Sequence, residues 1–457
     1  MAEQDRERCL KSLVWAIDQL EGKADSKQLE RIANLIIQTM TGPWRFFHTP
    51  DHIFEVGGAE DAVEVLAALF HDLVYVQVDQ GVSVNISCYI SAFVKEESQQ
   101  LIIREQGELR PDRMFELILA IFGFSPSQAL SPMAGQNEFL SAIIAAKALE
   151  HLLSASVIAE VAACIEATIP FRSKSDEGLS ACDRLHQRLH TVNQDFALGW
   201  SEEKMVAVVQ RAIRVANRDV ENFASPSSAH FLDNTWNLLP ETNHHLATPN
   251  SYTVHGYRTS IQKMEGFMNF LKPEVVFQQF RGEPASETYQ ALMEHTRRNL
   301  EAAKLYLGAK LVSIAIIEAL SFRIGRDIPI STMMGELPSP DYSTPQLEHF
   351  IPEISNHYVP DTELEREVLE LLEKGRNSDS SYDVKNSPIA TYVVKLVGFS
   401  EVRKLIGHAK EFFKGSITAE DFLAQCNPDV VQTVSNGVIQ LFRSREVALS
   451  QPNRVLV

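Results

Sequence analysis

Apolar residues recur along most of this chain at intervals of three and four, the spacing of an amphipathic helix. Residues 10–20 carry one such stripe, and residues 29–37 carry another that Gly42 and Pro43 bring to an end. No run alternates between apolar and polar residues as a half-buried strand would. The same patterns predict further helices over residues 59–75, 84–106, 112–123, 137–153, 155–168, 179–192 and 201–223. The sequence therefore predicts an all-α fold.

A turn-rich stretch from Ser225 to Thr253 separates this region from a second long helical region. The downstream patterns predict helices over residues 255–271, 284–325, 345–357, 361–375, 387–398, 400–413 and 418–443, with loops over 336–345 and 375–388. We interpret residues 1–250 as one domain and residues 251–457 as a helical C-terminal region of unknown role. The alternative is that the helices of residues 255–325 pack directly onto the first domain.

Three histidines and an aspartate lie within 25 residues in the first domain. His48 and His52 are four residues apart, and His71 and Asp72 form an adjacent pair on an otherwise apolar helix. Imidazole nitrogens and carboxylate oxygens are ligands of divalent cations. A His-Asp pair in an apolar setting needs a partner, which could be a metal or, in the simplest alternative, each other. The upstream histidines favour the metal.

His48 and His52 are not equivalent. Thr49 can cap a helix, and Pro50 suits its first turn, where a missing N–H costs nothing. His52 is therefore expected inside the helix and His48 just before it. This difference predicts separate roles for the two side chains.

The segments RFFHTPDHI at residues 45–53 and ALFHDLVY at residues 68–75 together resemble the HD superfamily of metal-dependent phosphohydrolases, especially its small bacterial members. The resemblance implies an all-helical HD-like core and a metal held by a histidine, a His-Asp pair and a distant aspartate. By position, His52 matches the first ligand, and His71 and Asp72 match the central pair. His48 matches the proton donor of the more distant cyclic-nucleotide phosphodiesterases.

The distant aspartate has to come from a later helix, and Asp219 is the best candidate. It stands on an otherwise good amphipathic helix, although a solvated carboxylate paired with Arg214 or Arg218 is an equal alternative. Many family members also have a histidine three residues after the Ile-x-x-Thr motif, where this chain has Phe171. That departure removes a usual ligand of a second metal. His186 and His190 could replace it, or could simply lie on a solvated helix face.

These matches imply a divalent cation, either Mn, Mg, Zn, Co or Fe, with one ion favoured over two. The expected activity is hydrolysis of a phosphoester in a small anionic molecule, such as a nucleotide-like one. Asp72 would orient water as well as bind metal, and His48 would protonate the leaving oxygen. Arg45 could bind a phosphate through its forked guanidinium, or be an ordinary surface arginine. The alternatives are a di-iron oxygenase of the same fold and a catalytically silent metal-binding regulatory protein.

Composition narrows the class of partner. The net charge of −18 argues against a nucleic-acid or anionic-membrane surface but not against a small anionic substrate. The five scattered cysteines and the polar N-terminus favour a reduced, cytoplasmic protein. The most apolar run, residues 311–320, is shorter than the roughly 20 residues needed to span a bilayer. A protein partner or a second copy of the chain could bind the C-terminal helices.

Overall fold

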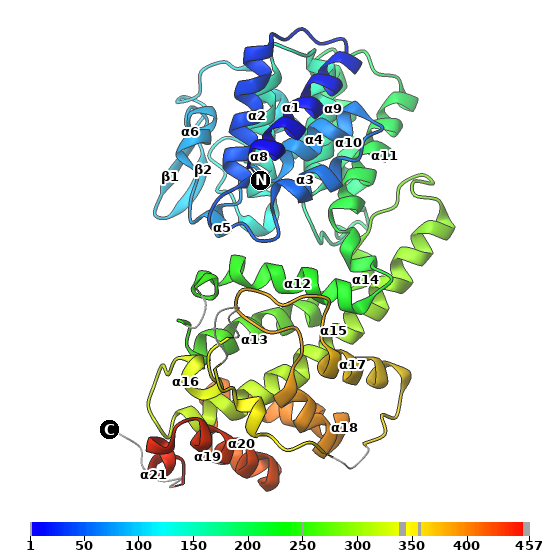
Figure 1. Cartoon of the computed structure of the whole chain (residues 1–457). Helices are drawn as coiled ribbons and strands as arrows, with labels where there is room; N and C mark the ends of the chain where they lie inside the picture. The colour runs from blue at the N-terminus through cyan, green and yellow to red at the C-terminus, as the bar shows by residue number, and fades with distance from the viewer. Residues whose placement is uncertain (1, 249–250, 338–343, 355–357, 451–457) are drawn as a thin grey trace. The chain divides into compact units, whose positions relative to one another are not determined.

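A computed structural model of the chain describes residues 2–248, 251–337, 344–354 and 358–450. The fold is predominantly α-helical, as predicted (Figure 1). The chain forms two compact units. Unit 1 comprises residues 1–224 and 272–294, and unit 2 comprises residues 225–271 and 295–457. Residues 225–248, assigned to the first domain from the sequence, thus group with unit 2, and residues 272–294 return to unit 1.

Unit 1 is a layered helical domain. Its helices are α1 (Ala2–Gln19), α2 (Ser26–Met40), α3 (Pro50–Gly57), α4 (Ala62–His71), α5 (Val76–Asp79), α6 (Val84–Ile90), α7 (Arg113–Phe122), α8 (Gln136–Leu149), α9 (Ala155–Ala167), α10 (Ala181–Asp195), α11 (Glu202–Asp219) and α14 (Pro273–Val276). Helix α4 lies at the centre, because it packs on α1, α3, α8, α9 and α11. Every residue of α4 from Val63 to His71 is buried. A helix that is apolar all round belongs inside a core.

One predicted helix of unit 1 is wrong. Residues 84–106 form the short helix α6 and then an antiparallel hairpin of β1 (Val94–Glu97) and β2 (Gln100–Ile103). Ser98 and Gln99 join the two strands with positive φ angles of 51° and 64°. Two successive residues in that conformation make the turn that favours a tight hairpin. Neither residue is the Gly, Asn or Asp that usually marks such a turn.

Unit 2 is also helical. It contains α12 (Ser228–Thr242), α13 (Val254–Phe270), most of α15 (Ser286–Ser321), α16 (Ile330–Met334), α17 (Glu363–Lys374), α18 (Pro388–Phe413), α19 (Ala419–Gln425), α20 (Pro428–Leu441) and α21 (Glu446–Leu449). The two helices predicted over 387–398 and 400–413 make up α18, which is interrupted at Gly398, whose φ of 79° and ψ of 160° are not helical. Residues 347–350 form only a 3-10 turn within the helix predicted over 345–357, and residues 355–357 lie outside the described part.

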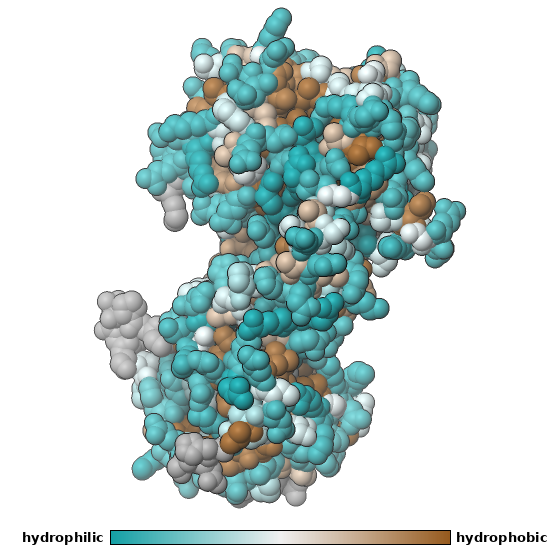
Figure 2. Space-filling view, turned by 90° about the vertical axis from the view of Figure 1, so that its right-hand side faces the viewer, coloured by the Kyte–Doolittle hydropathy of each residue, from teal (hydrophilic) through white to brown (hydrophobic). Residues whose placement is uncertain are grey.

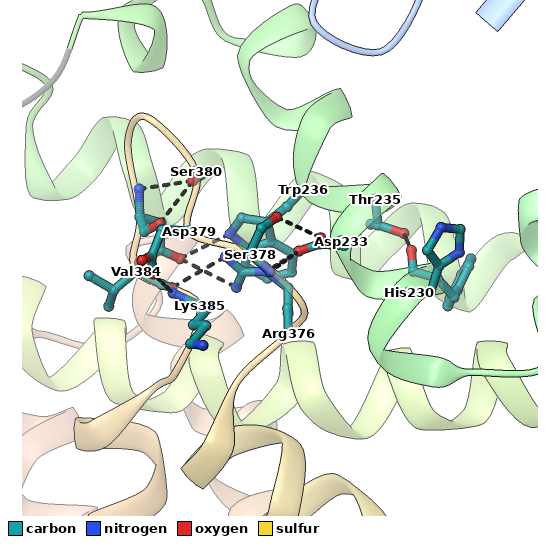
Figure 3. A network of polar contacts seen from close by, with 12 residues as sticks. His230, Asp233, Thr235, Trp236, Arg376, Ser378, Asp379, Ser380, Val384 and Lys385 are labelled. Atoms are coloured by element: carbon teal, nitrogen blue, oxygen red, sulfur yellow. Dashed lines mark hydrogen bonds and ion pairs between the residues drawn. The ribbon is translucent and has the colours of Figure 1, made fainter. Parts of the chain in front are cut away.

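A polar loop is folded into unit 2 between α17 and α18. Figure 3 shows how its residues reach back to α12, where Ser378 donates to Asp233 and the Arg376 guanidinium lies 4.2 Å from the Trp236 ring. In the same loop, Asp383 accepts hydrogen bonds from three buried side chains. The donors are Lys310 Nζ at 2.7 Å, Tyr257 Oη at 2.8 Å and Trp236 Nε1 at 2.9 Å. Asp383 therefore joins the loop to α12, α13 and α15.

The surface is polar where Figure 2 shows it, in keeping with a sequence that is 22% charged. The face shown in Figure 2 is mostly hydrophilic, and its hydrophobic side chains lie in small groups. Among the described helices, none combines the length and the apolar character that a membrane crossing requires.

Candidate metal centre

Three helix ends supply the side chains of a buried cluster in unit 1. Helix α3 begins at Pro50, after Thr49 in an extended conformation, and His52 is its third residue. Helix α4 ends at His71, and Asp72 is its C-cap, with φ −104° and ψ 15°. Asp219 is the last residue of α11. The helix start inferred at Thr49-Pro50 thus matches the structure, but the Thr49 side chain makes no capping hydrogen bond.

These four residues can each direct one ligand atom into a common space, with all four atoms within 4.8 Å of one another. Nε2 of His52 lies 3.0 Å from Oδ1 of Asp219, and Nε2 of His71 lies 3.3 Å from the same oxygen. Oδ2 of Asp72 is 3.1 Å from Nε2 of His71 and 3.4 Å from Nε2 of His52. Two imidazoles and two carboxylates therefore converge.

The hydrogen bonding of this cluster fits a divalent cation. Nδ1 of His71 donates to the carbonyl of Ala68 at 2.7 Å, so in the neutral ring the lone pair is on Nε2, which faces the cluster. Such a bond from the far ring nitrogen to a carbonyl is what orients metal-binding histidines. Oδ2 of Asp72 is buried and accepts no hydrogen bond despite its short distance to His71. A cation would satisfy this oxygen.

The close contact between imidazoles and carboxylates raises the pKa of the two histidines and lowers the pKa of the two aspartates. Burial by itself would lower the pKa of His52, but the hydrogen bond to Asp219 and the charges of Asp219 and Asp72 raise it to about 9. The pKa of His71 is raised for the same reasons. Burial opposes ionisation of the two carboxyl groups, yet the neighbouring histidines lower the pKa of both. Without a cation the histidines hold protons, so metal binding has to release them.

In EDTA-treated protein, we expect the free energy of unfolding to fall as the pH rises from 6.5 to 9. Folded His52 binds its proton more tightly than the unfolded chain does. Its contribution is therefore complete below pH 6.5 and disappears as the pH passes its folded pKa of about 9. Thermal melting across this range measures the slope, which should be shallower in a His52→Gln variant. Equal slopes in the two proteins would contradict the assignment.

Ion pairs between α4 and α11 fix the position of Asp219. Arg214 and Arg218 of α11 both bind Glu64, at 2.7 Å and 2.6 Å. One turn earlier, Arg211 binds Asp61, which also caps α4. The two arginines that could have paired with Asp219 are thus engaged with Glu64. The alternative of a solvated Asp219 carboxylate does not describe the structure, because this side chain faces His52 and His71.

Arg45 is neither a surface arginine nor a group available to a phosphate, which corrects both sequence-based interpretations. Its guanidinium is buried and binds Asp79 through two nitrogens, at 2.9 Å and 2.6 Å. A further nitrogen donates to the carbonyl of Asp72 at 2.9 Å. Arg45 therefore holds the backbone of Asp72 in place. Asp79 lies 34 residues away in sequence, so the pairing could not be inferred from local spacing.

His48 lies beside the cluster but outside its set of four ligands. Its half-buried ring is 5.6 Å from the ring of His52 and packs edge-on against Tyr75 at 4.6 Å. His48 also acts on the cluster, since it contributes electrostatically to the lowered pKa of Asp72. The structure thus separates the two N-terminal histidines, as the capping pattern predicted.

His186 and His190 do not reach this cluster. They form a second group with Glu202, whose carboxylate also binds Arg281 at 3.0 Å. Glu202 and Asp219 are the first and last residues of the 18-residue helix α11, about 25 Å apart at a rise of 1.5 Å per residue. The two histidines therefore cannot replace the ligand that Phe171 removes. The Phe171 ring packs against Phe223, with centroids 5.7 Å apart.

Sequence reasoning missed Glu138, on α8. Its Oε2 is buried and has no hydrogen-bond partner. The available signal was an acidic residue at the start of a helix that is otherwise apolar and buried. That pattern alone also describes an ordinary N-terminal charge on a helix, so only the packing distinguishes it.

Comparison with known proteins found no family model, no curated protein and no solved structure that matches this chain. What stands is a buried His/Asp cluster that could bind a metal and is compatible with an HD-like site. The functional argument therefore rests on the geometry.

Proposed function

We propose that this protein is a metal-dependent phosphohydrolase with an HD-like centre, acting on a small anionic phosphoester. The observation that carries the proposal is the convergence of His52, His71, Asp72 and Asp219 from three helix ends, with Oδ2 of Asp72 buried and without a hydrogen bond. Two histidines and two carboxylates form a ligand set for Mn, Fe, Co, Zn or Mg. One cluster of this composition supports one ion rather than two.

A bound cation there would lower the pKa of a coordinated water and offset charge on a phosphoryl oxygen. The residues of the chain supply the rest. Asp72 can orient water as well as bind the ion, because its backbone is fixed by Arg45. His48 lies next to the cluster and is not a ligand, so it is placed to donate a proton to a leaving oxygen.

Hydrolysis of p-nitrophenyl phosphate and bis(p-nitrophenyl) phosphate, with each metal in turn, tests the proposal. We expect His48→Asn to lower kcat by roughly 10²- to 10⁴-fold, the usual contribution of a proton donor, and to leave Mn²⁺ affinity unchanged. His151→Asn is the matched control, because that ring is exposed in the same unit. Lost Mn²⁺ binding in His48→Asn would contradict the separation of roles.

The alternatives predict different outcomes. A di-iron oxygenase needs further histidines, and His186 and His190 lie too far from the cluster to supply them. A silent regulatory protein would bind Mn²⁺ yet hydrolyse neither ester nor any of a panel of nucleotides.

A further inference from the structure

Glu138 is an acidic residue on a largely buried helix, and one of its carboxylate oxygens has no hydrogen-bond partner. It is the third residue of α8, a helix whose other residues are mostly apolar and buried. Its Oε2 is buried with no hydrogen-bond partner. A buried carboxylate oxygen without a partner destabilises a fold. An unpaired group of this kind needs an explanation beyond packing.

The position of Glu138 is linked directly to the metal centre. The segment that follows Asp72 is hydrogen-bonded to α8 at two residues, one before and one after Glu138 in sequence. The backbone N–H of Val76 donates to Asn137 Oδ1 at 3.2 Å, and that of Val74 donates to Ser141 Oγ at 3.0 Å. The start of α8 and the end of α4 are thus held together, with Glu138 between the two attachment points in sequence.

The charges of the cluster act on Glu138. Burial, together with the negative charges of Asp72 and Asp219, raises the pKa of its carboxyl group to about 8, against the opposing charge of Arg172. Glu138 does not belong to the group of four whose ligand atoms lie within 4.8 Å of one another. It is therefore not counted among the residues that could hold the same ion.

We infer that Glu138 is a positioning residue of the metal centre, whose carboxylate accepts a hydrogen bond from water held at the His52–His71–Asp72–Asp219 cluster. The inference rests on the proposed metal-dependent function. Leaving Oε2 without a protein partner destabilises the fold, but it keeps this oxygen available to the water.

A structural role offers the competing explanation, in which Glu138 exists only to balance Arg172. Nε of Arg172 is buried without a hydrogen-bond partner, but the hydrogen bonds that Arg172 does make all go to Glu166. Arg172 already binds Glu166 through Nη1 at 2.6 Å and the Glu166 carbonyl through Nη2 at 3.0 Å. Glu166 also accepts from Arg188. The anion that balances these two arginines is thus Glu166, which provides a matched control in the same unit.

The test compares Glu138→Gln with Glu166→Gln by two measurements. Calorimetric titration with Mn²⁺ gives the metal affinity, and thermal melting in EDTA at pH 9 gives the stability without metal. We expect Glu138→Gln to weaken Mn²⁺ binding by about 10- to 100-fold, the range for outer-shell partners of metal sites, and to melt higher than wild type. Glu166→Gln should melt lower and bind Mn²⁺ as wild type does.

Glu138→Asp separates a carboxylate requirement from a packing defect, because it keeps the charge and should recover part of the affinity. Unchanged Mn²⁺ affinity in Glu138→Gln would overturn the inference and leave the proposed function standing. Equal losses in Glu138→Asp and Glu138→Gln with lowered melting temperatures would overturn it in favour of a structural role. Wild-type protein that binds no Mn²⁺ would overturn the proposed function and this inference together.

Discussion

Asp219→Ala is expected to abolish measurable metal binding at the centre. The Asp219 carboxylate contacts both imidazoles, so its removal takes away a ligand and the group that orients His52 and His71. The loss of Mn²⁺ affinity should exceed the roughly 10- to 100-fold effect of outer-shell changes, and phosphoester hydrolysis should disappear with it. Calorimetric titration and elemental analysis of the purified protein measure the first effect.

Asp112→Asn is the control for that variant. Asp112 is a carboxylate of unit 1 that caps α7 and binds Lys147 at 2.8 Å, away from the cluster. Its replacement should lower stability without altering metal content. Wild-type metal content in Asp219→Ala would refute the ligand set.

Asp383→Ala is expected to cause the largest loss of stability in unit 2. The carboxylate accepts from Lys310, Tyr257 and Trp236, and the charges of Lys310 and Arg376 keep its pKa low in spite of burial. Removing it leaves a buried ammonium group without its anion. Breaking a buried ion pair in this way costs about 3–5 kcal/mol, which urea denaturation can measure.

Glu370→Gln provides the comparison, because the Glu370–Lys374 pair is exposed on α17 in the same unit. Such a pair adds little to stability, so its loss should leave the denaturation midpoint unchanged. Mn²⁺ affinity should be the same in both variants, since none of the metal ligands belongs to unit 2. A midpoint for Asp383→Ala equal to that of wild type would show that the network around Asp383 contributes nothing.

The four residues of the cluster could be recognised from sequence because their signals are local. An adjacent His-Asp pair, a Thr-Pro helix start before His52 and a carboxylate on an amphipathic helix each require only a few neighbouring residues. The contacts of Arg45 and Glu138 depend on chain segments far apart, Asp79 in one case and the absence of any partner in the other. Residue spacing contains no information on either.

In the fold, too, local features could be predicted from sequence and features that depend on distant contacts could not. Helical periodicity predicted the all-α class and long helices such as the one over 284–325, which matches α15. It missed the hairpin at 94–103, because Ser98 and Gln99 adopt positive φ without the residues that normally indicate it. It also could not show that residues 272–294 return to unit 1, because periodicity describes one helix at a time.

The origin of the ligands from three helix ends has a consequence for the order of events during synthesis. His52 and Asp219 are separated by 167 residues, so a cation bound by both acts as a cross-link that closes a loop across most of unit 1. Loops of that length are slow to close and restrict the unfolded chain strongly. The emerging chain cannot complete the site until α11 has left the ribosome. Metal loading would then be a late step, and a bound ion would mark a chain in which α3, α4 and α11 have come together.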